Sequence, residues 1–152
     1  MREPVAAPLL AADVQGTPAG SVGGDAVRVE YRYIQAMTCK GNRRVRVDPD
    51  GRVFADEATR DCLGGEHWNG PWPDQATVTL SAVDLARLRR QIEGAGIMEL
   101  PSQIVTPGHD GFREELDVAI GERRHSVIVE RARVPPGFQE VRDALLSLAG
   151  LM

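Results

Sequence analysis

Residues 81–101 (SAVDLARLRRQIEGAGIMELP) and 112–148 (FREELDVAIGERRHSVIVERARVPPGFQEVRDALLSL) carry the clearest structural pattern in this chain. In the first segment Ser81 is a typical helix cap, and leucine and isoleucine recur behind it at helical spacing. Gly94 and Gly96 then interrupt the pattern, as glycines do where a helix ends. The first segment therefore predicts a capped amphipathic helix.

The second segment predicts two strands and a second helix. Residues 112–120 alternate between apolar and polar side chains, which places Leu116 and Val118 on one face of a half-buried strand. A turn at Gly121 leads to a return strand. Pro135 then precedes another stretch with apolar residues at helical spacing, and proline is favoured at the start of a helix.

The N-terminal half predicts a hairpin. Residues 26–34 alternate with both tyrosines inward, and residues 44–48 continue the alternation up to the turn sequence Asp48-Pro49-Asp50-Gly51. Residues 77–80 suit a further short strand. The whole order predicts an α+β fold, an antiparallel sheet of about five strands with two amphipathic helices packed on one face.

Length and composition indicate one domain of ordinary size. The chain has 152 residues, of which 42% are hydrophobic and 26% charged, with a net charge of -4. This charge argues against nucleic acid as a partner, and no apolar run reaches the length of a membrane helix. Residues 1–25 are rich in Ala, Gly and Pro and are predicted to be a flexible leader before a single domain at 26–152. Such a leader suits an exported protein and equally suits a cytosolic tail.

The two cysteines, Cys39 and Cys62, are predicted to form a disulfide. When the strands of the hairpin are paired outward from the turn at Asp48 and Gly51, the two sulfur atoms come within reach of each other. In the chain-entropy model this bond contributes about 3 kcal/mol. The alternative is a pair of free, half-buried thiols in a reducing cytosol.

Both tryptophans lie in one Gly- and Pro-rich loop at residues 64–73. One interpretation is a lid in which the rings fold over the edge of the core. The other is an exposed contact loop, because tryptophan contributes strongly to protein interfaces. The predicted partner-binding residues are Trp68, Trp72, His67 and Asn69.

The sequence contains no recognisable catalytic motif. Its three histidines lie outside any zinc motif, and no nucleophile elbow or phosphate loop is present. His67 and His109 with Asp110 form the one candidate metal site. The alternative interpretation of residues 109–111 is a solvent-exposed turn ahead of a strand. His125 is expected to be a half-buried strand residue with a hydrogen-bonded ring. No catalytic residue, metal or cofactor is predicted.

The C-terminal half resembles the emfourin-type inhibitors, small bacterial proteins often encoded beside thermolysin-like metalloproteases. The similar elements lie within residues 85–148: the helix ending in Ile97-Met98-Glu99-Leu100-Pro101, the loop at Asp110, the strand with Arg124-His125-Ser126-Val127, and the proline-initiated last helix. That family has a Gly-rich strand and turn ahead of the first helix, where this chain has its hairpin and tryptophan loop, so no inhibitory residue is assigned. The hairpin, with Cys39 and Asp50-Gly51-Arg52-Val53, resembles an uncharacterised domain of bacterial envelope lipoproteins.

These observations lead to one expected function and two alternatives. We expect a non-catalytic protein-binding module, periplasmic or secreted, that inhibits or regulates an extracytoplasmic peptidase. The first alternative is a structural or accessory domain of an envelope complex. The second is a small metal-dependent hydrolase that uses His67 and His109, and a cytoplasmic location is the alternative to export.

Overall fold

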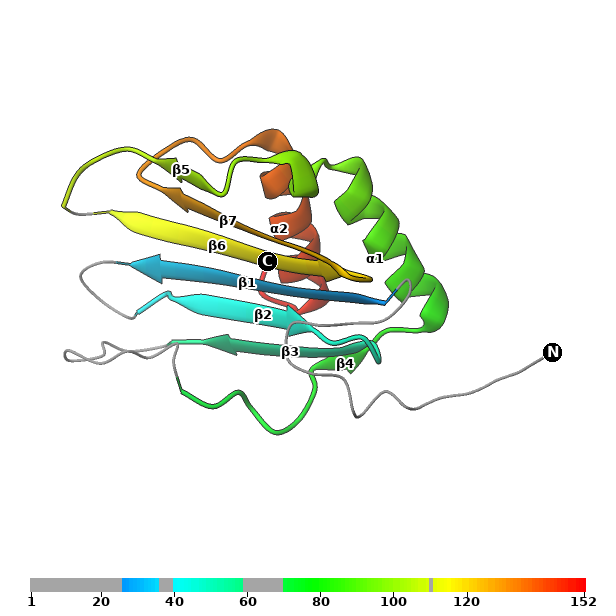
Figure 1. Cartoon of the computed structure of the whole chain (residues 1–152). Helices are drawn as coiled ribbons and strands as arrows, with labels where there is room; N and C mark the ends of the chain where they lie inside the picture. The colour runs from blue at the N-terminus through cyan, green and yellow to red at the C-terminus, as the bar shows by residue number, and fades with distance from the viewer. Residues whose placement is uncertain (1–25, 36–39, 59–69, 110) are drawn as a thin grey trace.

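The computed structural model describes residues 26–35, 40–58, 70–109 and 111–152. Within them, seven strands form one sheet in the order β4-β3-β2-β1-β6-β7-β5, and two helices lie on the same face of it (Figure 1). The elements are β1 (Val27–Gln35), β2 (Arg43–Val47), β3 (Arg52–Glu57), β4 (Val78–Thr79), α1 (Ala82–Gly94), a 3-10 helix (Ile97–Glu99), β5 (Gln103–Val105), β6 (Phe112–Ile120), β7 (Arg123–Glu130) and α2 (Pro136–Leu148).

The predicted α+β class is confirmed, with a larger sheet than expected. Every strand pair is antiparallel except one, in which β5 runs parallel to β7. Strand β5 is not predicted from the sequence. It has only three residues, of which two are exposed, and so it is too short to show an alternating pattern. None of the described helices is long and apolar enough to cross a membrane.

The predicted hairpin turn is present between β2 and β3. Gly51 has a φ of 91°, and its N–H donates to the Asp48 carbonyl at 2.9 Å. The Leu80 N–H donates to the Gly51 carbonyl at 2.8 Å, so the chain that enters α1 is held against this turn. A Cβ atom at Gly51 would lie 2.4 Å from the Leu80 carbonyl oxygen, and a positive φ is also unfavourable for other residues.

Helix α1 begins and ends where the sequence predicts, and α2 begins at the predicted prolines. The Ser81 hydroxyl accepts a hydrogen bond from the Asp84 N–H at 3.1 Å at the start of α1, and Gly96, with a φ of 74°, follows its end. The start of α2 approaches the end of α1 at a glycine. A Cβ atom at Gly137 would lie 2.2 Å from the Ala95 carbonyl oxygen, so the two helix ends meet where no side chain fits.

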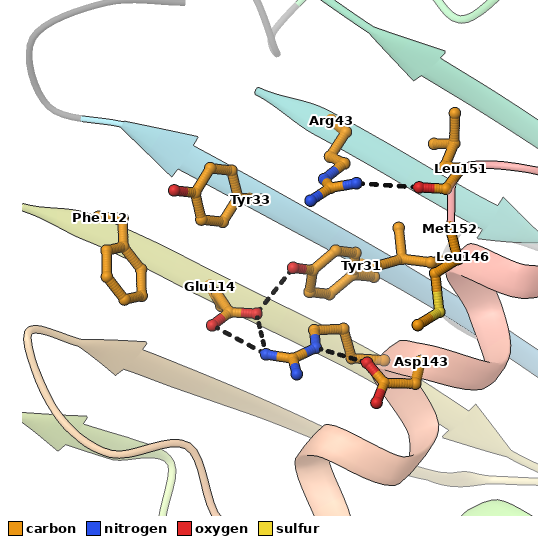
Figure 2. A pocket seen from close by; sticks show the side chains of 10 residues that line it. Tyr31, Tyr33, Arg43, Phe112, Glu114, Asp143, Leu146, Leu151 and Met152 are labelled. Carbon is orange, nitrogen blue, oxygen red and sulfur yellow. Dashed lines mark hydrogen bonds and ion pairs between the residues drawn. The ribbon is translucent and has the colours of Figure 1, made fainter. Parts of the chain in front are cut away.

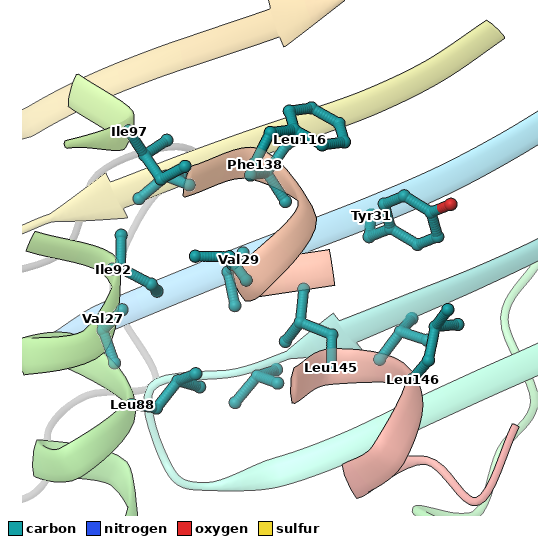
Figure 3. Close-up of a cluster of buried hydrophobic side chains, with 14 of the residues drawn as sticks. Val27, Val29, Tyr31, Leu88, Ile92, Ile97, Leu116, Phe138, Leu145 and Leu146 are labelled. Atoms are coloured by element: carbon teal, nitrogen blue, oxygen red, sulfur yellow. The ribbon is translucent and has the colours of Figure 1, made fainter. Parts of the chain in front are cut away.

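The register of β2, β1 and β6 arranges the side chains of the helix-facing side in rows. Each row takes one residue from β2, one from β1 and one from β6. Beginning under the helices, the rows are Val47–Val29–Val118, Val45–Tyr31–Leu116 and Arg43–Tyr33–Glu114. The first two rows are buried beneath the helices with Phe138 and Leu145 (Figure 3). The third row is polar, although its positions continue the inward-facing side of each strand. This change from apolar to polar marks the place where the site lies.

Candidate functional site

A pocket of about 430 Å³ lies between the third row and the C-terminal part of α2 (Figure 2). Its walls come from β1, β2, β6, α2 and the two residues Leu151 and Met152 that end the chain described. This volume lies within the range of pockets that bind small molecules. The pocket is therefore large enough to be a binding site.

Two aromatic rings form one wall of the pocket. The ring centroids of Tyr33 and Phe112 are 5.6 Å apart, with 30° between the ring planes. They meet because Phe112 is paired with Gln35, two residues beyond Tyr33 on β1. The Phe112 side chain remains 39% exposed, which is unusual for a large aromatic residue on a core-facing position.

A buried carboxylate forms the floor of the pocket. Glu114 is 3% exposed, and its Oε1 accepts hydrogen bonds from the Tyr31 hydroxyl at 2.7 Å and from Arg142 Nη1 at 3.1 Å. Arg142 also donates from Nε to Asp143 at 3.0 Å. Since a buried charge is costly unless it is paired and hydrogen-bonded, α2 has to place Arg142 here for Glu114 to be tolerated.

The surroundings keep the Tyr31 phenol protonated and the Arg142 guanidinium charged near neutral pH. Burial raises the pKa of the Tyr31 phenol, and the Glu114 carboxylate raises it further. Burial lowers the pKa of the Arg142 guanidinium, but its hydrogen bonds to Asp143 and Glu114 outweigh this and raise the pKa overall. Tyr31 therefore remains a hydrogen-bond donor, and Arg142 remains a cation.

Arg43 on β2 is the second cation of the pocket. Its Nη1 donates to the Leu151 carbonyl at 3.0 Å, and its guanidinium carbon lies 5.9 Å from the Tyr33 ring centroid (Figure 2). Glu57 lies opposite Arg43 in the β2–β3 register but is exposed. Among the described residues no carboxylate pairs with Arg43, and its buried Nε has no hydrogen-bond partner.

The pocket combines apolar walls with paired charges and one further cation. Its walls are aromatic and aliphatic, its carboxylates are engaged by Arg142 and Tyr31, and Arg43 supplies a cation at one side. The described lining includes no histidine, cysteine or serine that would act as a base or nucleophile. Apolar walls with a few placed polar groups are typical of recognition sites.

The tryptophan loop, the predicted contact site, lies on the other side of the sheet where it is described. Trp72 is half-buried, with Arg44 at 4.1 Å and Arg46 at 4.9 Å from one of its rings. The Arg44 guanidinium donates to the Pro71 carbonyl at 2.7 Å and so holds the chain at Trp72. Trp72 thus covers the outer face, away from the helices. The other three predicted contact residues, Trp68, His67 and Asn69, lie outside the described residues.

Arg44 is itself unusual, because it is 1% exposed on the outer face of the sheet. Burial lowers the pKa of its guanidinium, and the hydrogen bond and charge of Asp56 oppose this. Its Nη2 lies 3.2 Å from Asp56 Oδ2. Arg44 therefore connects β2, β3 and the loop before Trp72.

The other sequence predictions are met in part. His125 is partly buried, and its Nε2 lies 2.6 Å from the Leu100 carbonyl, as predicted for a hydrogen-bonded strand residue. His109 is exposed in the loop after β5. The part of the chain that the structure describes contains no group of three or more metal-ligating side chains. The remaining candidates, namely His67, Asp110, the Cys39–Cys62 disulfide and the leader at 1–25, lie outside the described residues.

The pocket residues were not singled out from the sequence. Tyr33 was placed on the inward side by its alternation with Val29, but as part of the core. Arg43 and Glu114 occupy inward positions when the alternation of Val45 and Leu116 is extended by two residues. A charged residue at an inward position of a strand was the signal that could have indicated this site.

Comparison with known proteins assigns no family to this chain. No family model matches the sequence, and no curated protein matches it. The resemblances to emfourin-type inhibitors and to an envelope lipoprotein domain therefore stay predictions.

Proposed function

We propose that this chain is a non-catalytic protein-binding module whose contact site is the pocket beside the end of α2. The observation that carries the proposal is the pair of aromatic rings, Tyr33 and Phe112, left partly open at the end of a helix-facing surface that is otherwise buried. Aromatic residues that stay exposed in a concave site are typical of protein interfaces.

The proposed partner is an extracytoplasmic peptidase, which the chain inhibits or regulates from a periplasmic or secreted location. This choice of partner rests on the resemblance of residues 85–148 to emfourin-type inhibitors. The paired charges of the pocket agree with a binding role, since Glu114 and Asp143 both accept hydrogen bonds from Arg142.

A photo-crosslinking experiment in the producing cells tests the binding role. The full chain carries p-benzoylphenylalanine at position 112, where an aromatic side chain is already present and 39% exposed. The matched control carries it at position 83 on α1, where the valine is 64% exposed and lies outside the pocket. We expect one discrete adduct from position 112 that unlabelled protein competes away.

The outcomes of this experiment separate the proposals. An adduct with a peptidase supports the inhibitory role, which a stoichiometric loss of that peptidase's activity on addition of the purified chain then tests. An adduct with another envelope protein supports an accessory role and rejects the peptidase. No adduct at position 112, or the same products from positions 112 and 83, rejects the pocket as the contact site.

A further inference from the structure

We propose that the pocket binds the C-terminal residue of the partner chain, with Arg43 holding the terminal carboxylate and the aromatic wall holding an apolar side chain. This inference rests on the proposed function and specifies its ligand. A single residue fits, because the pocket of about 430 Å³ is within the range of pockets for small molecules.

The distribution of charge around the pocket indicates a carboxylate. Of its four charged side chains, Glu114 and Asp143 both accept hydrogen bonds from Arg142, and Glu114 also accepts one from Tyr31. On the β2 side Arg43 has no carboxylate partner among the described residues, and Glu57, opposite it in the register, is exposed and unpaired with it. The four charges sum to zero, but the two acids share Arg142. Arg43 is thus the cation without a carboxylate partner among the described residues, which favours an anionic ligand on the β2 side.

The hydrogen bonds of Arg43 leave capacity for a ligand. Within the described residues its one side-chain hydrogen bond runs from Nη1 to the Leu151 carbonyl, a neutral acceptor. A guanidinium binds carboxylates through parallel N–H donors, and such charge-assisted bonds are stronger than neutral ones. The contact with Leu151 and the ring of Tyr33 orient the group before any ligand binds.

The apolar part of the ligand has a matching surface next to this cation. Tyr33 and Phe112 present one wall, and Leu146 and Leu151 present another. A C-terminal residue carries its carboxylate and its side chain on the same carbon atom, so one residue reaches both parts of the pocket. An internal acidic residue would need a second residue to fill the aromatic wall.

An NMR titration with three small probes tests this inference on the full chain labelled with ¹⁵N and ¹³C. N-acetylphenylalanine mimics the C-terminal residue, N-acetylphenylalaninamide lacks the carboxylate, and N-acetylglutamic acid α-amide presents the acid on a side chain. We expect saturable shifts at Arg43, Tyr33 and Phe112 with the first probe and a dissociation constant on the order of 1 mM. The other two probes should bind about tenfold more weakly.

Variants identify the role of Arg43. Arg43→Gln should weaken N-acetylphenylalanine by about tenfold and leave the amide unchanged, whereas Arg43→Lys should keep part of the preference for the acid. Arg123→Gln, which changes a guanidinium outside the pocket with a side chain that is 58% exposed, is the matched control and should change neither. Melting curves show whether each variant is folded.

Several results would overturn the inference. The first is equal affinity for N-acetylphenylalanine and N-acetylphenylalaninamide, and the second is tighter binding of N-acetylglutamic acid α-amide. The others are that the folded wild-type protein binds no probe, or that the NMR shifts are confined to another surface. The crosslinking from position 112 is independent of these results. Suppose that the wild-type protein binds none of the probes and that the adduct from position 112 still forms in Arg43→Gln. The binding role then stands, and the C-terminal carboxylate is rejected as the ligand.

Discussion

Tyr31 on β1 donates a hydrogen bond of 2.7 Å to Glu114 on the neighbouring strand β6. The two residues lie in successive rows of the sheet, so the bond joins the last apolar row to the first polar one. On one side of it lies the core, and on the other lies the pocket. The bond orients Glu114 for Arg142, which reaches it from α2 at 3.1 Å.

Glu114→Ala should destabilise the fold by about 2–3 kcal/mol. The substitution leaves Arg142 and the Tyr31 hydroxyl without their shared acceptor. The value is at the low end for a broken buried pair because the Arg142 side chain is 21% exposed to water. Asp117→Ala, on the outer face of the same strand with a side chain 47% exposed, should cost less than about 1 kcal/mol. Denaturant unfolding of both variants at pH 7 checks this, and equal losses would reject the importance of the buried cluster.

The free energy of unfolding should fall as the pH rises above about 10. The pKa of Tyr31 is raised in the folded state by burial and by Glu114, so the folded protein keeps a proton that the unfolded chain loses. This contribution to stability is complete below the pKa of the unfolded tyrosine and is lost above it, by about 1.4 kcal/mol per pH unit for one proton. Because the tyrosine of the unfolded chain is only partly ionised in this range, Tyr31→Phe should reduce the slope between pH 10 and 11 by about 1 kcal/mol per pH unit. An unchanged slope in urea unfolding would show that Tyr31 does not retain its proton.

Gly137→Ala should destabilise the packing of α2 on α1 by about 1–3 kcal/mol. The new Cβ atom would lie 2.2 Å from the Ala95 carbonyl oxygen, so the helices have to move apart. Gly94→Ala is the matched control, because nothing lies within 4 Å of the added atom and the residue is at the end of α1. It should be neutral or stabilise by a few tenths of a kcal/mol, up to about 1. Thermal unfolding of the two variants in parallel measures the contrast.

Trp72→Ala should lower stability by about 2 kcal/mol. The half-buried ring contacts Arg44 and Arg46. Its loss would expose Arg44, which is 1% exposed in the wild type. Trp72→Phe keeps a ring for the two cations and should recover at least half of the loss. A melting temperature of Trp72→Ala equal to that of the wild type would mean that the loop contributes little to the fold and is free to bind a partner.

The parts of the fold that depend on local pattern could be predicted from the sequence. The turn at Asp48–Gly51 and the cap at Ser81 are determined by residues close together in the chain. Strand β5 could not be predicted, because its three residues pair in parallel with β7, which lies more than 20 residues further along. Short strands of this kind are determined by tertiary packing rather than by their own composition.

The pocket depends on contacts that no local pattern shows. Glu114 and Arg43 look like ordinary surface charges unless the strand alternation is extended to them, and Arg142 lies just beside the buried stripe of α2. Only the packing of α2 on the sheet shows that Arg142 contacts Glu114 and that, within the part of the chain the structure describes, Arg43 has no carboxylate partner. The sequence predicts the tryptophan loop as the contact site because tryptophan contributes strongly to interfaces, whereas Trp72 covers the outer face of the sheet beside Arg44.

The affinity of the partner protein for Phe112→Ala and Trp72→Ala, measured beside their melting temperatures, tests the proposed contact site most directly. The partner is the protein crosslinked at position 112. We expect Phe112→Ala to weaken binding by about 2 kcal/mol, roughly 30-fold, with a melting temperature within a few degrees of the wild type. Trp72→Ala should lower the melting temperature and leave the affinity of the folded protein unchanged. Loss of binding in a folded Trp72→Ala protein, with full binding by Phe112→Ala, would contradict the pocket as the contact site and place it on the tryptophan loop.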